Sequence, residues 1–126
     1  MSDLQAKGLP FELGGVERHL LFTLAVVDEV QAKYDKPVSD VLFDMKDPEK
    51  TYEILAFITK ALVNDEIARN NYFNNRSDSE VTDQEIKWMI DVPTSAQLVK
   101  VIFKAFGYSI PEDEDDDPNL TKSPNS

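Results

Sequence analysis

The stretch FELGGVERHLLFTLAVVDEVQAKY, residues 11–34, contains the change of pattern from which the fold is predicted. Apolar and polar residues alternate over 11–13 and resume over 16–20, and the intervening Gly14-Gly15 accepts the positive φ values of a tight turn. The pattern therefore predicts a β-hairpin over 11–20. A two-residue turn would place Glu12 opposite Glu17, a like-charge pair, whereas a bulge would shift the register by one residue, so the sequence leaves the register open.

After residue 20 the apolar residues recur at helical spacing. This spacing predicts an amphipathic helix that Pro37 ends, followed by a short turn over 39–43. The apolar stripe of this helix is expected at Leu21, Leu24, Val27, Val30 and Tyr34.

A second long helix is predicted from Asp47-Pro48, because a capping residue followed by proline is typical of a helix start. Asn64-Asp65 is expected to interrupt this helix, which leaves a third helix over 66–74. The second helix has a wide apolar stripe at Tyr52, Leu55, Ile58 and Leu62, flanked by Ile54, Phe57 and Ala61.

The second half of the chain contains a specific signal for a helix start. After a turn-rich loop over 74–79, Thr82 and Glu85 form a capping box, in which a hydroxyl and a carboxylate satisfy free backbone N–H groups. Pro93 is expected to end the helix that begins there.

The last predicted helix follows this proline. Thr94 or Ser95 is expected to cap it, and Gly107 is expected to stop it. Its apolar stripe is predicted at Leu98, Val101, Ile102, Ala105 and Phe106.

Together these elements predict a mainly α (α+β) protein, in which a short N-terminal β-hairpin packs on a compact bundle of about five helices. We expect a flexible leader over 1–9 and a single domain over 10–110. The remainder, 111–126, reads PEDEDDDPNLTKSPNS and holds six acids and one base. Because it has too little apolar surface to offset the entropy of ordering, a disordered acidic tail is predicted.

The 126-residue chain is acidic, since 24 Asp and Glu against 13 Lys and Arg give a formal charge of −11. This charge argues against nucleic acid and anionic membranes as partners. With no cysteine and a single histidine, His19, the chain lacks thiolate sites and most metal and general-base arrangements. We therefore expect a protein that is not an enzyme and has no cofactor or metal, with a structural role for His19.

Three other patterns could suggest a function. None of the four glycines lies in a loop that would cradle a phosphate before a helix. The acidic run 113–118 lacks the central glycine and the distant glutamate of a calcium-binding loop. The unit over 82–106 has the shape of a helix-turn-helix, but it offers only Gln97, Lys100 and Lys104 to a groove in an acidic chain, which disfavours a DNA reader.

Aromatic residues gather in the second half of the chain and are the remaining signal. Phe106 is expected to fill the core. Phe103 and Trp88 fall off the main stripes of their helices, so they either pack on the hairpin or line an exposed groove. Such a groove would mark a partner site and would suit an amphipathic helix. The residues proposed to bind a partner are Tyr72, Phe73, Trp88, Ile102 and Phe103.

The order of elements points to a family. A short leader precedes the FELGG hairpin, whose second strand runs into HLLFTLAVVDEVQAKYDKPVSDVL; a helical middle, VTDQEIKWMID and the closing LVKVIFKAFGYSIPEDEDD follow. Over residues 9–115 this arrangement resembles the tail assembly chaperones of long-tailed bacteriophages and prophages. The resemblance rests on element order, length and these strings, and the family has no motif whose residues could be carried over one by one.

The resemblance implies a non-catalytic protein of the host cell cytoplasm that takes part in virion morphogenesis and is absent from the mature virion. Such proteins coat the helical, poorly soluble tape measure protein until tail tube subunits polymerise around it. The family often makes a longer product by ribosomal frameshifting, which is thought to recruit the tail tube protein. The cytoplasmic location agrees with a sequence that shows neither a secretion signal nor a membrane-spanning run. Self-association is expected to be weak or driven by the client.

An acidic inhibitor or adaptor of the DNA-mimic type, bound to a host enzyme, is the alternative function. It predicts carboxylates arrayed in a band on the folded body and binding that weakens steeply in salt. The chaperone hypothesis predicts an apolar groove and binding that survives salt.

Overall fold

The computed structural model describes residues 8–108 and confirms the predicted fold class. The predicted tail over 111–126 and the first seven residues of the predicted leader lie outside the described residues. The described part contains a hairpin and five helices: β1 (Leu9–Leu13), β2 (Val16–Leu20), α2 (Leu24–Tyr34), α3 (Val38–Asp44), α4 (Thr51–Asn74), α5 (Asp83–Met89) and α6 (Val92–Tyr108).

The hairpin has the register of a tight two-residue turn. Gly14 and Gly15 have φ values of 60° and 80°, and Glu12 pairs with Glu17, so no bulge shifts the strands. Both glutamates are exposed, and water screens their repulsion. Leu9 is buried and pairs with Leu20, which places it in strand β1 and not in the leader predicted over 1–9.

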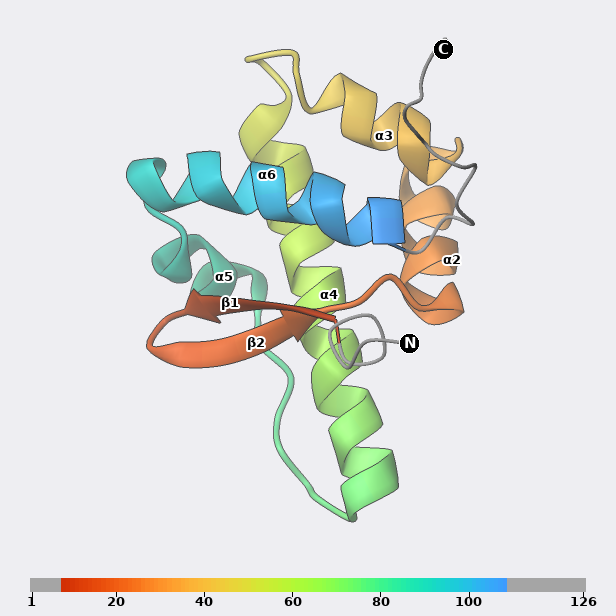
Figure 1. Ribbon diagram of the computed structural model, residues 1–126, viewed down its shortest axis with the longest axis vertical. Coiled ribbons are helices and arrows are strands. Elements are labelled where there is room, and N and C mark those ends of the chain that lie inside the picture. Colours follow the sequence, from red (N-terminus) through yellow and green to blue (C-terminus); the bar gives the residue numbers. More distant parts are fainter. Residues whose placement is uncertain (1–7, 109–126) are drawn as a thin grey trace, which may run out of the picture.

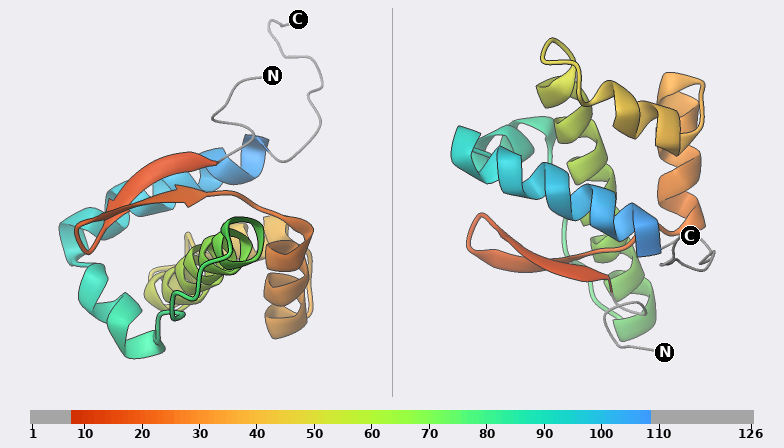
Figure 2. Two further views of the ribbon diagram at one scale, coloured as in Figure 1. Left: turned by 90° about the horizontal axis from the view of Figure 1, so that it is seen from below. Right: turned by 45° about the horizontal axis from the view of Figure 1, so that its top comes forward.

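Helix α4 is the centre of the molecule. The hairpin and α6 lie on one side of it, while α5 and α2 flank it (Figures 1 and 2). Strand β1 packs on α6, and β2 packs on α4. The side chains that these elements bury together form one core; its largest fully buried members include Leu13, Leu20, Leu42, Leu55, Ile58, Leu62, Ile86, Leu98 and Ile102.

The predicted break in α4 at Asn64-Asp65 is wrong, because α4 is continuous over 24 residues. The Asn64 side chain accepts a hydrogen bond from the Val81 N–H (2.7 Å) and donates one to the Val81 carbonyl (3.1 Å). The Asp65 carboxylate accepts one from the Thr23 hydroxyl (3.0 Å). These polar side chains form hydrogen bonds with neighbouring segments. They therefore do not form the bonds to the backbone of α4 that would interrupt the helix. The residues predicted as a third helix are the last turns of α4.

In the first half of the chain, two helices begin at other residues than the sequence predicts. Thr23 caps α2, which therefore begins at Leu24 and buries Val26 and Val30, while the Leu24 side chain is 82% exposed. The predicted stripe through Leu24 is thus wrong. Helix α4 begins at Thr51, after a turn in which the Asp47 carboxylate accepts a hydrogen bond from the Glu49 N–H (3.0 Å).

The capping box at the start of α5 is confirmed: the Thr82 hydroxyl accepts from the Glu85 N–H (3.2 Å) and Glu85 accepts from the Thr82 N–H (2.8 Å).

The expected cap of the last helix is wrong, because the Asp91 carboxylate accepts from the Thr94 N–H (2.8 Å) and α6 begins at Val92. Pro93 lies in the first turn of α6, where its missing N–H has no partner to lose.

The last helix follows its predicted stripe but not its predicted end. Leu98, Ile102 and Ala105 are buried, and Phe106 is half-buried with its ring edge-on to Phe22 at 5.3 Å between centroids. Gly107 is a residue of α6, which continues to the last described residue, so Gly107 does not stop the helix.

Thr59 presents an opportunity to stabilise the fold. Its side chain is fully buried, and its hydroxyl has no hydrogen-bond partner among the described residues. We expect Thr59→Val to raise the free energy of unfolding by about 1 kcal/mol, because valine has the same shape and no polar atom to bury. Urea denaturation followed by circular dichroism measures the change. Thr59→Ser, which keeps the hydroxyl and loses the methyl group, is the control and should destabilise; a valine variant no more stable than the wild type would contradict the prediction.

Candidate partner-binding surface

Two of the predicted partner-binding residues form an exposed aromatic pair. Tyr72 and Phe73 lie in the last turn of α4 and are 81% and 74% exposed. Their rings meet edge to face with centroids 4.9 Å apart. This end of α4 extends beyond the hairpin (Figure 1) and is supported by the following loop, because the Asn71 side chain bonds both the N–H and the carbonyl of Asp78 (3.0 Å each). We call Tyr72 and Phe73 the aromatic tip.

The other three predicted residues do not join this pair. Trp88 is 76% exposed, but α5 packs on the N-terminal half of α4, away from the aromatic tip. Phe103 is half-buried on α6 and packs against the core. Ile102 is fully buried in the core, so its assignment to a partner-binding surface is corrected: a partner could not reach it without opening the fold.

The structure reveals a groove that the sequence did not predict. A hollow of about 440 Å³ lies between α2, α4 and α5, and a second of about 220 Å³ lies between α4, α5 and the start of α6. Tyr52, Ala56 and Lys87 line both, so the two hollows adjoin. Figure 2 (left) shows α5 on one side of α4 and α2 on the other, while the hairpin covers a different side of α4. We call this feature the α4–α5 groove; it is lined by Lys33, Tyr52, Glu53, Leu55, Ala56, Phe57, Asp83, Ile86, Lys87, Ile90, Asp91, Val92 and Ser95.

Much of the α4–α5 groove is apolar and open to solvent. Tyr52 is 56% exposed, and Val92 is also exposed, while Ala56 and Ile90 are half-buried. The sequence placed Tyr52 on the buried stripe of its helix, and the structure corrects this. The width of that stripe was the signal for an exposed apolar residue. A helix with apolar residues on more than one face has more apolar surface than a single neighbouring element can bury.

The carboxylates in the groove are already hydrogen-bonded by the protein. Glu53 accepts from the Tyr34 hydroxyl (2.5 Å), Asp83 from Lys60 Nζ (2.7 Å), and Asp91 from the Thr94 N–H. Burial, together with Glu53, raises the pKa of Tyr34 far above its usual range, so the hydroxyl remains a donor. The hydrogen bond from Lys60 lowers the pKa of the Asp83 carboxyl, which therefore stays ionised at neutral pH.

Neither Lys33 nor Lys87 forms an ion pair within residues 8–108. Lys33 Nζ lies 5.5 Å from the ring centroid of Phe57 and 6.0 Å from that of Tyr34. The charged side chains of the groove without an ion pair in the described residues are therefore two lysines, Lys33 and Lys87, and two acids, Glu53 and Asp91.

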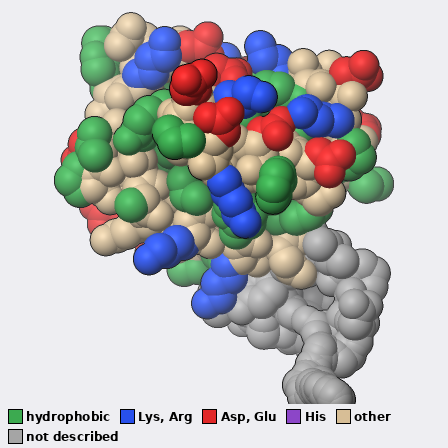
Figure 3. All heavy atoms as spheres, turned by 90° about the horizontal axis from the view of Figure 1, so that it is seen from above, with side chains coloured by type: hydrophobic (Ala, Val, Ile, Leu, Met, Phe, Trp, Pro, Cys, Tyr) green, Lys and Arg blue, Asp and Glu red, His purple; other side chains and the backbone are tan. Residues whose placement is uncertain are grey.

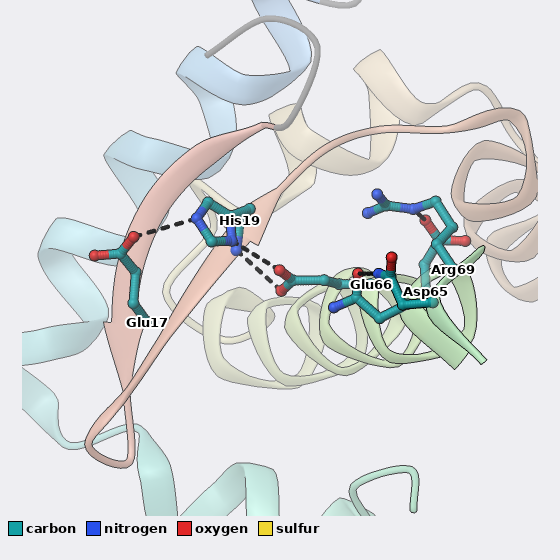
Figure 4. A network of polar contacts seen from close by, with 7 residues as sticks. Glu17, His19, Asp65, Glu66 and Arg69 are labelled. Atoms are coloured by element: carbon teal, nitrogen blue, oxygen red, sulfur yellow. Dashed lines mark hydrogen bonds and ion pairs between the residues drawn. The ribbon is translucent and has the colours of Figure 1, made fainter. Parts of the chain in front are cut away.

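A separate polar network fixes the hairpin to α4 (Figure 4). The buried Glu66 carboxylate accepts a hydrogen bond from the backbone N–H of His19 (3.0 Å), and its second oxygen lies 2.8 Å from His19 Nδ1. His19 Nε2 lies 3.2 Å from the Glu17 carboxylate. The preceding residue of α4, Asp65, accepts hydrogen bonds from the Thr23 hydroxyl and from Arg69 Nε. His19 thus has the structural role predicted for it, at a distance from the groove.

Comparison with protein-family models, curated proteins and solved structures finds no match to this chain. Its function must therefore be inferred from its own surface and from the resemblance described above.

Other features of the described part bear on the function classes. Residues 8–108 contain no group of three His, Cys, Asp or Glu side chains placed to hold a metal ion. No helix in this range has both the length and the apolar character needed to cross a membrane. On the face drawn in Figure 3, acidic side chains alternate with basic and hydrophobic ones and do not form a continuous band.

Proposed function

We propose that this chain is a non-catalytic chaperone that binds a helical, poorly soluble client in the α4–α5 groove. The observation that carries the proposal is the groove itself, in which Tyr52 and Val92 remain exposed beside two adjoining hollows. An apolar groove between helices is a common way to bind the apolar face of an amphipathic helix. The apolar side chains do the binding, and the ionisable groups keep the complex dispersed.

The resemblance to phage tail assembly chaperones indicates which protein the client is. The chain would bind the tape measure protein in the host cytoplasm during tail assembly, and would be absent from the mature virion. The tail tube protein would be reached through a longer, frameshifted product. A formal charge of −11 favours solubility of a complex that contains an apolar client. Several copies along one client would associate weakly or only when the client is present.

Coexpression with a tape measure fragment tests this function. We expect the fragment to be soluble and to copurify with the chain, including in about 1 M salt, where the screening length falls to about 3 Å. The double variant Tyr52→Ser/Val92→Ser should reduce the recovered complex roughly tenfold, because each serine removes about 1 kcal/mol or less of apolar contact from the groove. Leu24→Ser is the control, since Leu24 is an exposed apolar residue outside the groove.

Two results would contradict the proposal. Failure of the client to copurify, with no gain in its solubility, would remove the chaperone function. A complex that forms in low salt, dissociates in high salt and is displaced by DNA would favour the acidic inhibitor instead.

A further inference from the structure

Two exposed apolar surfaces lie at opposite ends of α4. The aromatic tip is at the C-terminal end, and Tyr52 lies in the first turn, where it lines the α4–α5 groove. We propose that the groove of one copy is covered by the aromatic tip of a second copy until a client helix displaces it. This inference goes beyond the proposed function, because it concerns the chain in the absence of its client.

The first argument is the position of the two surfaces within one copy. Tyr72 and Phe73 at the tip and Tyr52 and Val92 in the groove are all exposed. Because α4 is a continuous helix, Tyr52 and Tyr72 are about 30 Å apart along its axis. A tip therefore reaches a groove only on another copy. Since the contact joins two different surfaces, it can continue from copy to copy.

The second argument is the shape of the two surfaces. The end of α4 that carries the tip projects beyond the hairpin (Figure 1), and the groove is concave. The smaller hollow of the groove, about 220 Å³, is lined by Leu55, Ile90 and Val92 among others. It lies below the range of about 300–1,000 Å³ that is usual for small-molecule sites. A hollow of this size and character suits aromatic side chains that project from another protein surface.

The third argument is the kind of polar group on each surface. The groove is lined by three carboxylates and two ammonium groups, which belong to Glu53, Asp83, Asp91, Lys33 and Lys87. Residues 67–77, which include the tip, contain four asparagines and no acid. An amide donates to a carboxylate and accepts from an ammonium group. A surface rich in amides therefore suits a groove in which both signs of charge occur.

The charges next to the tip are already balanced. Arg69 pairs with Asp65 and Arg76 pairs with Asp78, each at 2.9 Å between nitrogen and oxygen. Two copies that each have a formal charge of −11 repel each other, and this balanced end of α4 adds little to that repulsion. Because salt screens the repulsion and leaves apolar contacts intact, we expect association to strengthen as the salt concentration rises.

Sedimentation velocity of the full-length chain over a series of concentrations tests the inference. We expect weak association, with a dissociation constant on the order of 0.1–1 mM, because the contact is well below the standard size of a stable interface. An increase in salt from about 0.05 M to about 0.5 M should strengthen it about threefold. A tape measure fragment should dissociate the assemblies, because it competes with the tip for the groove.

Two double variants provide the sharpest test when they are mixed. Tyr72→Ala/Phe73→Ala removes the tip and keeps residues that favour a helix, and Tyr52→Ser/Val92→Ser weakens the groove. Each variant alone should associate at least about tenfold more weakly than the wild type. An equimolar mixture should form a dimer and nothing larger, because one intact tip then meets one intact groove.

A third double variant controls for the loss of exposed apolar surface. Leu24→Ser/Phe43→Ser removes two exposed apolar side chains that belong neither to the tip nor to the groove. We expect this variant to associate like the wild type. Circular dichroism establishes that each variant is folded.

Several outcomes would overturn the inference. A chain that stays monomeric at every concentration would refute it, and copurification of the client would then leave the proposed function intact. Association that the tip variant loses and the groove variant keeps would mean that two tips contact each other. If the chain associates only after Ile110→Ser/Leu120→Ser, the C-terminal segment covers the groove instead of a tip. Restoration of the dimer in the mixture, without any binding of the client, would support the inference and remove the proposed function.

Discussion

Replacement of Glu66 by alanine is expected to lower the free energy of unfolding by about 3 kcal/mol. The Glu66 carboxylate is buried and holds both the backbone N–H and the Nδ1 atom of His19. Alanine would leave these two groups without a partner in a partly buried position and would remove a direct link between the hairpin and α4. Urea denaturation followed by circular dichroism gives the difference.

Glu66→Gln separates the hydrogen bonds from the charge. The glutamine carbonyl can accept from the His19 N–H, and its amide can donate to Nδ1 of a neutral imidazole whose Nε2–H still faces Glu17. We expect this variant to lose about 1 kcal/mol, much less than the alanine variant. If glutamine and alanine destabilise the fold equally, the hydrogen bonds to His19 are not what Glu66 contributes.

Replacement of Leu62 by alanine is expected to cost a similar amount, about 3 kcal/mol. Leu62 is fully buried in the middle of α4, against which the hairpin and four helices pack. Its truncation removes apolar contacts and leaves a cavity that this crowded position cannot close. Thermal and urea denaturation measure the loss.

Leu24→Ala is the matched control for Leu62→Ala. Both leucines lie on helices and both were expected in buried stripes, but the Leu24 side chain is 82% exposed. We expect its truncation to change the free energy of unfolding by less than about 0.5 kcal/mol. Equal losses from the two substitutions would mean that Leu24 is covered in solution, for example by another copy of the chain.

Features determined by neighbouring residues could be predicted from the sequence. Gly14-Gly15 is sufficient for a hairpin turn because both residues adopt positive φ without a steric cost. Thr82 and Glu85 specify a helix start through hydrogen bonds made within four residues. The stripe of α6 was predicted because its apolar residues repeat with little ambiguity.

The errors arose where distant segments decide the outcome. Asn64 and Asp65 resemble helix breakers, but their partners, Val81 and Thr23, lie elsewhere in the chain. In the run Leu24–Val27 every residue is apolar, so periodicity alone does not determine which side chains are buried. Asp91 competes with Thr94 and Ser95 as a cap, and only the backbone geometry selects it.

The candidate site shows the same division. Trp88 and Phe103 were placed off the stripes of their helices, which left open whether they pack on the hairpin or line a groove; Trp88 is exposed and Phe103 is half-buried. The α4–α5 groove could not be predicted, because its walls come from α2 and α5, which are separated by more than 45 residues. The sequence placed Ile102 both on the core stripe of α6 and among the residues that bind a partner. Its complete burial shows that it belongs to the core.

The unequal packing along α4 has a consequence for amide hydrogen exchange. All buried side chains of this helix lie between Ile54 and Ile67, and the turns from residue 68 onward bury none. Amides in the first part should become exchangeable only when the whole domain unfolds, whereas those of the last turns should exchange through fraying at a much smaller free energy. The aromatic tip therefore lies on the part of α4 that opens most easily, while the core between Ile54 and Ile67 stays closed.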